Sequence, residues 1–212
     1  MRKVLLTGFE PFGGESINPS LELVKQMASR ALPQVEIIGC EVPVVRYQAI
    51  ETVLQAVETH QPDLVLMIGQ ASGRCAITPE RVAINLDDYR IEDNAGHQPV
   101  DEPIIATGPA AYFSTLPVKA ITHALQQAGI PCQISHSAGT FVCNHLFYGV
   151  QHHLHTRAIR SGFIHIPLLP EQASASNQPS MSLETLVHGL EIMMMTCLET
   201  EQDTKHTGGT IC

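Results

Sequence analysis

Apolar residues occur along the chain in two kinds of pattern, and the first is the short continuous run. Leu64 to Ile68 is such a run, closed by Gly69, and is typical of a central strand covered on both faces of a sheet. Similar apolar or β-like segments recur before and after it. Together they predict strands at 4–6, 35–42, 64–68, 82–86, 132–136 and 162–166.

The second pattern is a spacing of three or four residues between apolar positions, which is typical of a helix that packs one face on a core. Asn18-Pro19 opens the first such segment, because asparagine caps helices well and proline suits the first helical position. Gly129 and Pro131 close a later one, and Ser182 is placed to cap the last. The spacing predicts helices over 18–31, 50–60, 118–128, 145–156 and 182–197.

Strands that alternate with helices predict an α/β fold. We expect a three-layer α/β/α sandwich with a twisted, mostly parallel central sheet, formed by a single domain over residues 1–212. Residues 70–109 interrupt the alternation with a loop-rich excursion, a kind of segment that often carries function or an interface. A polar linker is expected at 172–180 and a flexible tail at about 203–212.

Composition indicates which classes of partner are disfavoured and in which cell compartment the protein is expected. The net charge of −9 argues against nucleic acid or an anionic membrane as a partner. No apolar run approaches the roughly 20 residues that span a bilayer, and Met1-Arg2-Lys3 leads into only about four apolar residues, too few for a signal peptide. The six cysteines are scattered without a C-x-x-C pair. These features predict a cytoplasmic protein with reduced cysteines.

Cys143 stands where a predicted strand gives way to a predicted helix. The unpaired N–H groups and the positive end of a helix dipole favour a thiolate there, and a lowered pKa turns cysteine into a nucleophile. Gly8-Phe9, Gly69-Gln70 and Ile166-Pro167 also lie just past strand ends, which gather at one edge of a parallel sheet. The pattern therefore predicts a cysteine hydrolase whose active site lies at that edge.

A thiol nucleophile needs a base, and that base needs a group to orient it. His165 is a candidate base because it interrupts an apolar strand end, and His145, two residues past Cys143 on a different helix face, is its rival. Glu80, at the start of a β-like stretch, is a candidate orienting group. Spacing does not decide between it and the competing carboxylates of Asp87, Asp88 and Asp93.

The sequence disfavours a metal or a phosphate site. His152 and His155, spaced i, i+3, could share a metal ion, but no carboxylate or cysteine nearby in sequence completes a ligand set. The glycine-rich loop 8–14 matches no phosphate-binding motif. Its two phenylalanines, Phe9 and Phe12, either clamp a small flat ligand or fold back onto the core.

Long stretches of the chain resemble the pyroglutamyl peptidase I family of cysteine peptidases, also called pyrrolidone-carboxylate peptidases. The resemblance runs from Lys3 to about Gln172 and rests on LLTGFEPFGG (5–14), ITPERVAIN (77–85), AGTFVCN (138–144) and GFIHIP (162–167). It implies hydrolytic removal of an N-terminal pyroglutamyl (5-oxoproline) residue from peptides, without a cofactor. It also implies a homo-oligomer, a tetramer or dimer, whose interface could come from the Met-rich last helix or from residues 70–109.

By the same resemblance, the family's nucleophile matches Cys143, its general base His165 and its acidic third member Glu80. Arg90 matches an arginine that stabilises the oxyanion together with the backbone N–H of Cys143. The walls of the substrate pocket match Phe9, Phe12, Ile91, Phe141 and Val142, with Asn18 and Gln70 at polar positions nearby. Some relatives have threonine where this chain has Val44, which makes the pocket more apolar here. Two other functions stay open: another thiol amidohydrolase, and a non-catalytic α/β protein that binds a small ligand.

Overall fold

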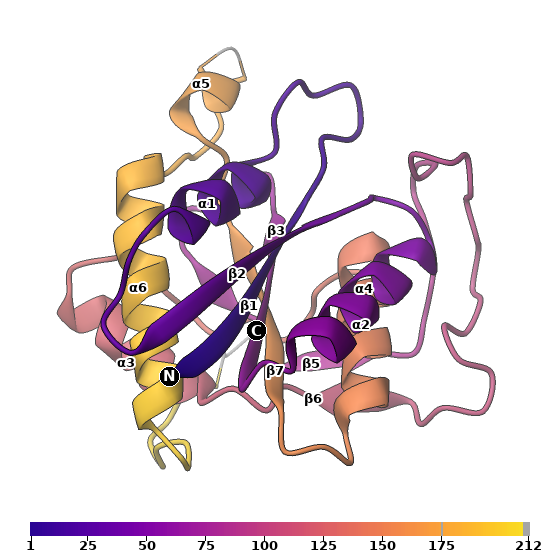
Figure 1. Cartoon of the computed structure of the whole chain (residues 1–212). Coiled ribbons are helices and arrows are strands. Elements are labelled where there is room, and N and C mark those ends of the chain that lie inside the picture. Colours follow the sequence, from indigo (N-terminus) through magenta and orange to yellow (C-terminus); the bar gives the residue numbers. More distant parts are fainter. Residues whose placement is uncertain (175, 210–212) are drawn as a thin grey trace.

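The computed structural model describes residues 1–174 and 176–209. Its elements follow the chain in the order β1 (Arg2–Phe9), α1 (Pro19–Ala28), β2 (Val35–Val42), α2 (Gln48–His60), β3 (Leu64–Gln70), β4 (Thr78–Pro79), β5 (Val82–Ile84), β6 (Ala111–Phe113), α3 (Val118–Gln127), α4 (Val142–Leu154), β7 (Arg160–Ile166), α5 (Pro170–Ala173) and α6 (Leu183–Glu199) (Figure 1). None of the helices in this described part of the chain is long and apolar enough to cross a membrane. The predicted alternation of strands and helices is confirmed.

A five-stranded sheet with the strand order β2-β1-β3-β7-β4 runs through the middle of the molecule (Figure 1). β1 pairs in parallel with β2 and β3, and β3 pairs in parallel with β7. Among the described strands of this sheet, β4 alone is antiparallel, and it pairs with β7. β5 and β6 form a separate antiparallel pair. The predicted α/β fold with a mostly parallel central sheet is therefore confirmed.

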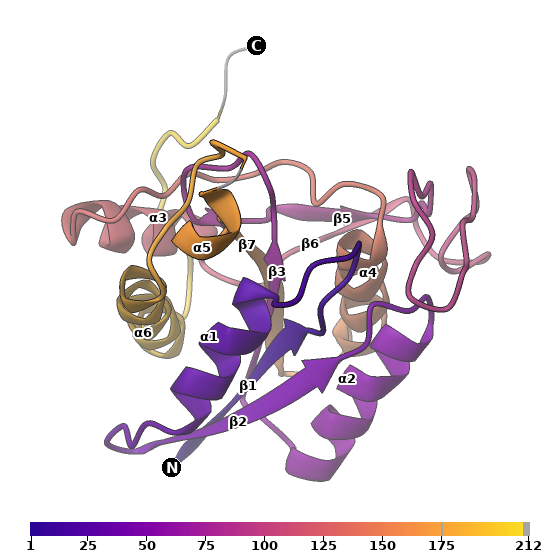
Figure 2. The ribbon, with the colours of Figure 1, turned by 90° about the horizontal axis from the view of Figure 1, so that it is seen from above.

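Helices cover both faces of the sheet and complete a three-layer arrangement (Figure 2). α1, α3 and α6 pack on one face, and α2 and α4 pack on the other. Successive side chains of a strand point to opposite faces. In β3 the side chains that join the first core are Leu64, Leu66 and Ile68. Those that join the second core are Val65 and Met67, and this burial on both faces explains why the strand is a continuous apolar run.

β1 and α1 approach each other closely at Gly8, and this contact fixes the end of β1. A Cβ atom at Gly8 would lie 2.5 Å from the carbonyl oxygen of Ser20, so only glycine fits between strand and helix. The Ser20 hydroxyl accepts a hydrogen bond from the backbone N–H of Phe9 at 2.9 Å. Asn18 caps the helix by accepting from the backbone N–H of Ser20 at 3.1 Å. The predicted helix start at Asn18-Pro19 is confirmed.

Residues 132–136, predicted as a strand, form only single bridges with the segment 77–81. Gln133 N–H donates to the carbonyl of Ile77, and Ser135 N–H donates to the carbonyl of Pro79, as in a parallel ladder. Pro79 has no N–H to return, so the ladder is interrupted at its centre. The predicted strand is therefore wrong. The helix that follows begins at Val142 rather than at residue 145, which places Cys143 in its first turn.

Residues 203–209 pack against α3. Asp203 accepts hydrogen bonds from the backbone N–H groups of Lys119 and Ala120, each at 3.0 Å, and so caps α3 from a distant part of the chain. Arg81 donates to the carbonyl of Gly208 at 3.3 Å. These contacts place residues 203–209 against α3, where Asp203 satisfies donors at the start of the helix, and the flexibility expected from about residue 203 stays a prediction. Residues 210–212 of the predicted tail lie outside the described residues.

Candidate active site

The predicted nucleophile and the predicted base meet at Gly69, near the carboxyl end of β3. A Cβ atom at Gly69 would lie 3.1 Å from Cys143 Sγ. Gly69 is also the residue opposite His165 where β3 pairs with β7. Residues opposite each other in a sheet point their side chains to the same face. The register of the sheet therefore brings the thiol and the imidazole together on one face.

Glu80 forms a buried pair with His165. The His165 Nδ1 atom lies 2.7 Å from Glu80 Oε1, and the carboxylate is fully buried. The short strand β4 makes this pair, because it places Thr78 opposite His165 and lets the backbone N–H of Glu80 donate to the carbonyl of Phe163 at 2.8 Å. The carboxylate fixes the imidazole with its Nδ1 proton toward Glu80, which leaves Nε2 to face the reacting atoms.

The surroundings of His165 favour the neutral form of its imidazole. Burial lowers the pKa of His165, the bond to Glu80 raises it, the charge of Arg74 lowers it, and the net effect is a decrease. The ring centroid of Phe163 lies 4.9 Å from that of His165 and confines the imidazole from one side. A confined, neutral imidazole with one nitrogen held by a carboxylate is suited to accept a proton.

The surroundings of Cys143 differ from what its place at a helix N-terminus predicted. Burial of the sulfur, reinforced by the charge of Glu80, raises the pKa of the Cys143 thiol to about 12, and the charge of Arg74 opposes this only in part. The expectation of a lowered pKa is wrong for the substrate-free chain, because desolvation outweighs the helix N-terminus. Cys143 and His165 are both described residues, and no hydrogen bond joins their side chains. Such contacts often tighten only when substrate binds.

His145, the rival base, belongs to a second histidine–carboxylate pair. Its Nδ1 lies 2.9 Å from Asp87 Oδ2, and both side chains are fully buried. Its Nε2 accepts a hydrogen bond from the backbone N–H of Tyr47 at 2.8 Å. Both ring nitrogens of His145 are thus engaged, whereas the Nε2 of His165 has no hydrogen-bond partner within the described part of the chain. The geometry favours His165 over His145 as the base.

The other two competing carboxylates, Asp88 and Asp93, lie in the loop that follows Asp87. Asp93 accepts hydrogen bonds from the backbone N–H groups of Arg46, Ala95 and His97 at 2.7 to 2.9 Å, and Asp88 is exposed. Asp93 therefore organises a turn of the excursion at 70–109, and it is Glu80 whose carboxylate contacts His165.

A small apolar pocket, here called the ring pocket, lies beside Cys143. Its lining residues are Phe9, Phe12, Asn18, Val44, Gln70, Phe141, Val142 and Cys143. The rings of Phe12 and Phe141 lie 5.9 Å apart, and the cavity between the walls measures about 10 Å³. A flat ligand enters only when these side chains part. Of the pocket residues predicted from the sequence, Ile91 is the one that does not line this cavity.

The match to known proteins covers nearly the whole chain. The family model described as pyroglutamyl peptidase matches residues 2–200. The chain belongs to the pyroglutamyl peptidase family. It is 99% identical over 212 residues to the pyrrolidone-carboxylate peptidase of Vibrio vulnificus (strain CMCP6), with 100% of both chains covered. It is 60% identical to that of Vibrio campbellii (strain ATCC BAA-1116), again with 100% of both chains covered.

Solved structures of pyroglutamyl peptidases have the same fold. The crystal structure of pyroglutamyl peptidase I from Bacillus amyloliquefaciens superimposes with a TM-score of 0.94 and 48% identity, covering 97% of this chain and 99% of that chain. A mutant pyrrolidone carboxyl peptidase from Pyrococcus furiosus gives a TM-score of 0.90 and 42% identity, covering 93% and 98%. As a member of the pyroglutamyl peptidase family, the chain is a cysteine-type hydrolase of the exopeptidase class.

Arg90 and Ile91, both predicted as site residues, lie outside the ring pocket. Both are exposed, and they line a neighbouring cavity of about 340 Å³. The two cavities share Phe12, Gln70 and Phe141 as walls. The structure therefore places Arg90 in the cavity next to the ring pocket, and not in the lining of the ring pocket itself.

Sequence reasoning missed Arg74, which contacts Glu80, one of the three catalytic candidates. Its Nη1 atom lies 2.7 Å from Glu80 Oε1 and also donates to Thr78 Oγ1, and its Nη2 atom donates to the carbonyl of Ser137 at 3.2 Å. Arg81, the neighbour of Glu80 in sequence, does not supply this contact, since its side chain donates to the carbonyl of Gly208. A separation of six residues within a loop follows no regular period, so no pattern signals the Arg74–Glu80 pair.

The arrangement supports acyl transfer from an amide to a thiol and then to water. It holds a thiol, an imidazole with one nitrogen available, a buried carboxylate that orients this imidazole, and an apolar pocket beside the sulfur. Within the described residues, no group of three or more histidine, cysteine, aspartate or glutamate side chains could hold a metal ion. His152, considered with His155 as a ligand, instead lies with its Nδ1 2.8 Å from Tyr112 Oη.

Proposed function

We propose that this chain hydrolyses the amide bond after an N-terminal pyroglutamyl residue of a peptide, through a thioester on Cys143. The observation that carries the proposal is the buried Glu80–His165 pair, set against the same Gly69 as the thiol and next to the ring pocket. The names of the relatives, pyrrolidone-carboxylate peptidase and pyroglutamyl peptidase I, support this class of substrate.

Acylation starts from a neutral thiol and a neutral imidazole. As Cys143 Sγ bonds to the carbonyl carbon, its proton passes to His165 Nε2, and Glu80 stabilises the resulting imidazolium through Nδ1. When the tetrahedral intermediate collapses, the C–N bond breaks and the imidazolium gives its proton to the leaving amine. The pyroglutamyl group stays on Sγ as a thioester, and the shortened peptide departs.

Deacylation repeats these steps with water in place of the thiol. His165 removes a proton from water as its oxygen bonds to the thioester carbon, and the C–S bond then breaks. The departing sulfur takes the proton back from the imidazolium, which restores the neutral pair. Because both half-reactions use the same imidazole nitrogen, the orientation imposed by Glu80 serves both.

The negative oxygen of each tetrahedral intermediate needs hydrogen-bond donors. The first N–H groups of a helix have no partner within the helix, and Cys143 is the second residue of α4. We assign its backbone N–H as one donor of the oxyanion site. We assign the second donor to Arg90, whose exposed side chain lines the cavity next to the ring pocket and turns toward the carbonyl once a peptide is seated.

The ring pocket suits a neutral lactam. No charged side chain lines it, so an ordinary peptide would bury its terminal ammonium there at a large cost in desolvation. The Gln70 side-chain oxygen accepts from Gln172 Nε2 at 3.2 Å, which leaves the Gln70 amide group to donate to the lactam carbonyl. Asn18 uses its side-chain oxygen to cap α1 and offers its remaining N–H. Val44 adds an apolar contact.

Release of a chromophore from a pyroglutamyl amide tests this function. We expect the wild-type chain to release it, iodoacetamide to block release, and Cys143→Ala to abolish turnover while keeping the circular dichroism spectrum. Cys40→Ala is the matched control, because Cys40 is a similarly half-buried thiol in β2, away from His165. Turnover of other amides only would indicate a different thiol amidohydrolase. Binding of pyroglutamate without any turnover would indicate a non-catalytic binding protein.

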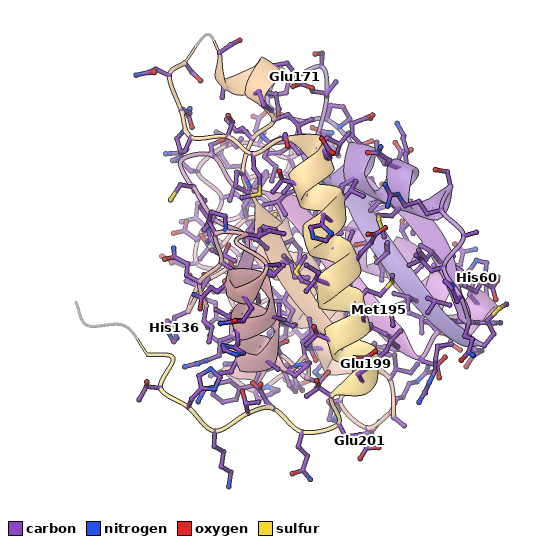
Figure 3. All side chains as sticks on the ribbon, turned by 90° about the vertical axis from the view of Figure 1, so that its left-hand side faces the viewer. His60, His136, Glu171, Met195, Glu199 and Glu201 are labelled. Carbon is purple, nitrogen blue, oxygen red and sulfur yellow. The ribbon has the colours of Figure 1, made fainter. Side chains whose placement is uncertain are left out.

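We also propose that the chain forms a homo-oligomer, a dimer or a tetramer, through the outer side of α6. Figure 3 shows Met195 and Glu199 along this helix, on the side of the molecule that faces the viewer. A groove of about 530 Å³ lies there, lined by Leu32, Pro33, His188, Glu191, Ile192, Met195, Thr196 and Glu199. Exposed apolar surface of this kind marks interfaces. Light scattering should give a multiple of the chain mass that Met195→Glu reduces; a monomeric wild type would contradict the proposal.

We propose the cytoplasm as the compartment of this chain. The five described cysteines are all free thiols, and scattered free thiols fit a reducing environment. Fractionation of cells with an antibody to the chain tests this proposal, and recovery outside the cytoplasm would contradict it.

A further inference from the structure

Arg74 connects three separate segments around the candidate catalytic pair. It lies in the loop between β3 and β4, where Gly73 adopts a positive φ of 83° and the Arg74 N–H donates to the carbonyl of Ala71 at 3.3 Å. Its guanidinium reaches β4 through Thr78 and Glu80, and reaches the segment before α4 through the carbonyl of Ser137. About three quarters of the side chain is buried. The guanidinium is therefore held in place from several directions.

Glu80 shares one oxygen between two positive or potentially positive groups. Oε1 lies 2.7 Å from Arg74 Nη1 and 2.7 Å from His165 Nδ1. Oε2 is buried and has no hydrogen-bond partner among the described residues. Burial of a carboxylate without a partner is costly, and the guanidinium of Arg74, which stays protonated in proteins, is the permanent counter-ion of Glu80. The imidazole of His165 then has no need to carry a positive charge of its own.

We propose that Arg74 is a positioning residue for catalysis: its guanidinium holds the Glu80 carboxylate aimed at His165 and supplies the positive charge there, so that His165 takes up no extra proton before the thiol attacks. This inference rests on the proposed function and deepens it. A pair that already held that proton could not accept one from Cys143. Arg74 would thus set the pH at which the base becomes available.

Removal of the Arg74 charge raises the proton affinity of His165, because that charge is one of the effects that lower its pKa. A neighbouring charge of this kind shifts a pKa by about one unit or more. We therefore expect the acid limb of the pH profile of kcat/KM to move up by about one pH unit in Arg74→Gln. At a pH below the limb, kcat/KM then falls about tenfold, and the loss shrinks as the pH is raised.

Three variants separate charge from packing. Arg74→Gln removes the charge but keeps a side-chain group that can donate hydrogen bonds. Arg74→Lys keeps the charge but cannot place two separate nitrogens, as Arg74 does, toward Glu80 and the carbonyl of Ser137. Arg81→Gln is the matched control, since Arg81 adjoins Glu80 in sequence but bonds to the carbonyl of Gly208. We expect a shifted acid limb in Arg74→Gln, a limb near the wild-type position in Arg74→Lys, and a wild-type profile in Arg81→Gln.

Nuclear magnetic resonance titration of labelled histidines reads the same effect without substrate, with the His165 signal assigned by His165→Asn. The proposal requires a higher titration midpoint for His165 in Arg74→Gln than in wild type. An unchanged midpoint and acid limb in a folded Arg74→Gln would overturn it. If Arg74→Gln fails to fold, an acid limb of Arg74→Lys displaced by a full unit would overturn it instead. If the wild-type chain does not hydrolyse pyroglutamyl amides, but the titration midpoint of His165 is higher in Arg74→Gln than in wild type, only the proposed function is refuted.

Discussion

Gly69→Ala is the substitution that most directly tests the geometry of the site. The added Cβ would lie 2.7 Å from Phe163 Cζ, 2.9 Å from Phe163 Cε1 and 3.1 Å from Cys143 Sγ. Ordinary contacts between carbon atoms are about 3.5 to 4.0 Å, so the methyl group cannot fit unless the phenyl ring or the sulfur moves. The change therefore pushes on the nucleophile without removing any polar group.

The ring of Phe163 has little room to yield. Its centroid lies 4.9 Å from that of His165, 6.0 Å from that of Phe147 and 6.3 Å from that of Phe9, so three rings surround it. Overpacking at such a site costs about 1–3 kcal/mol of unfolding free energy. A displacement of the sulfur by about 1 Å lowers the rate about 100-fold. We expect Gly69→Ala to combine both losses, with the larger effect on kcat.

The assay pairs urea unfolding with kcat/KM on a pyroglutamyl amide, and it measures the alkylation rate of Cys143 by iodoacetamide. Gly39→Ala in β2 is the control, because its Cβ would lie 3.1 Å from Val24 Cγ1 and 3.2 Å from Ala28 Cβ, within the packing of α1 on the sheet. It should lower stability and leave kcat/KM within about twofold, since packing losses far from the site do not move the reacting atoms. Wild-type kcat/KM and alkylation in a folded Gly69→Ala would show that Cys143 is not held against Gly69.

Three further predictions concern the pocket, the loop and the tail. Phe12→Ala should raise KM for pyroglutamyl amides more than it lowers kcat, because it removes one wall of the ring pocket; unchanged steady-state kinetics would contradict the clamp. Burial tends to raise the pKa of Asp93, but backbone N–H groups outweigh it and the pKa is lowered. The stabilisation is therefore present above the unfolded pKa of about 3.9 and is lost as the pH falls through the folded pKa, so the difference in unfolding free energy between wild type and Asp93→Asn should shrink from pH 6 to pH 3. Asp203→Ala should cost about 0.5–2 kcal/mol in urea unfolding by uncapping α3, with kcat/KM unchanged.

The long elements of the fold are predictable because burial on a regular element leaves a regular pattern. The run at 64–68 became β3, and the strand expected at 35–42 has those bounds in the structure. β4 and β6 are two and three residues long, too short to show alternation. The error at 132–136 has a single atomic cause, since Pro79 on the partner segment cannot donate the hydrogen bond that would complete the ladder. Asp203 is a cap supplied from far along the chain, which local spacing cannot reveal.

The candidate site could be predicted where it depends on sheet topology and motif resemblance. The proximity of Cys143 and His165 was expected from strand ends that meet at one edge of the sheet. Glu80 was selected by the family resemblance alone, and the short strand β4 that places it beside His165 was not foreseen. The protonation state could not be predicted. Helix position favours a thiolate at Cys143, but the burial that opposes it depends on the tertiary fold, which sets the sulfur against Gly69 of β3.

The two histidine–carboxylate pairs explain why residue type does not identify a base. His145–Asp87 and His165–Glu80 each bury an imidazole whose Nδ1 meets a carboxylate oxygen within 3 Å. In both pairs that carboxylate also meets an arginine, Arg46 for Asp87. The pairs differ at the far nitrogen, which in His145 accepts a backbone N–H and in His165 lies on the face of the sheet that carries the thiol. The carboxylate and the arginine are common to both pairs, so the proposal of His165 as the base depends on its Nε2, which has no hydrogen-bond partner among the described residues.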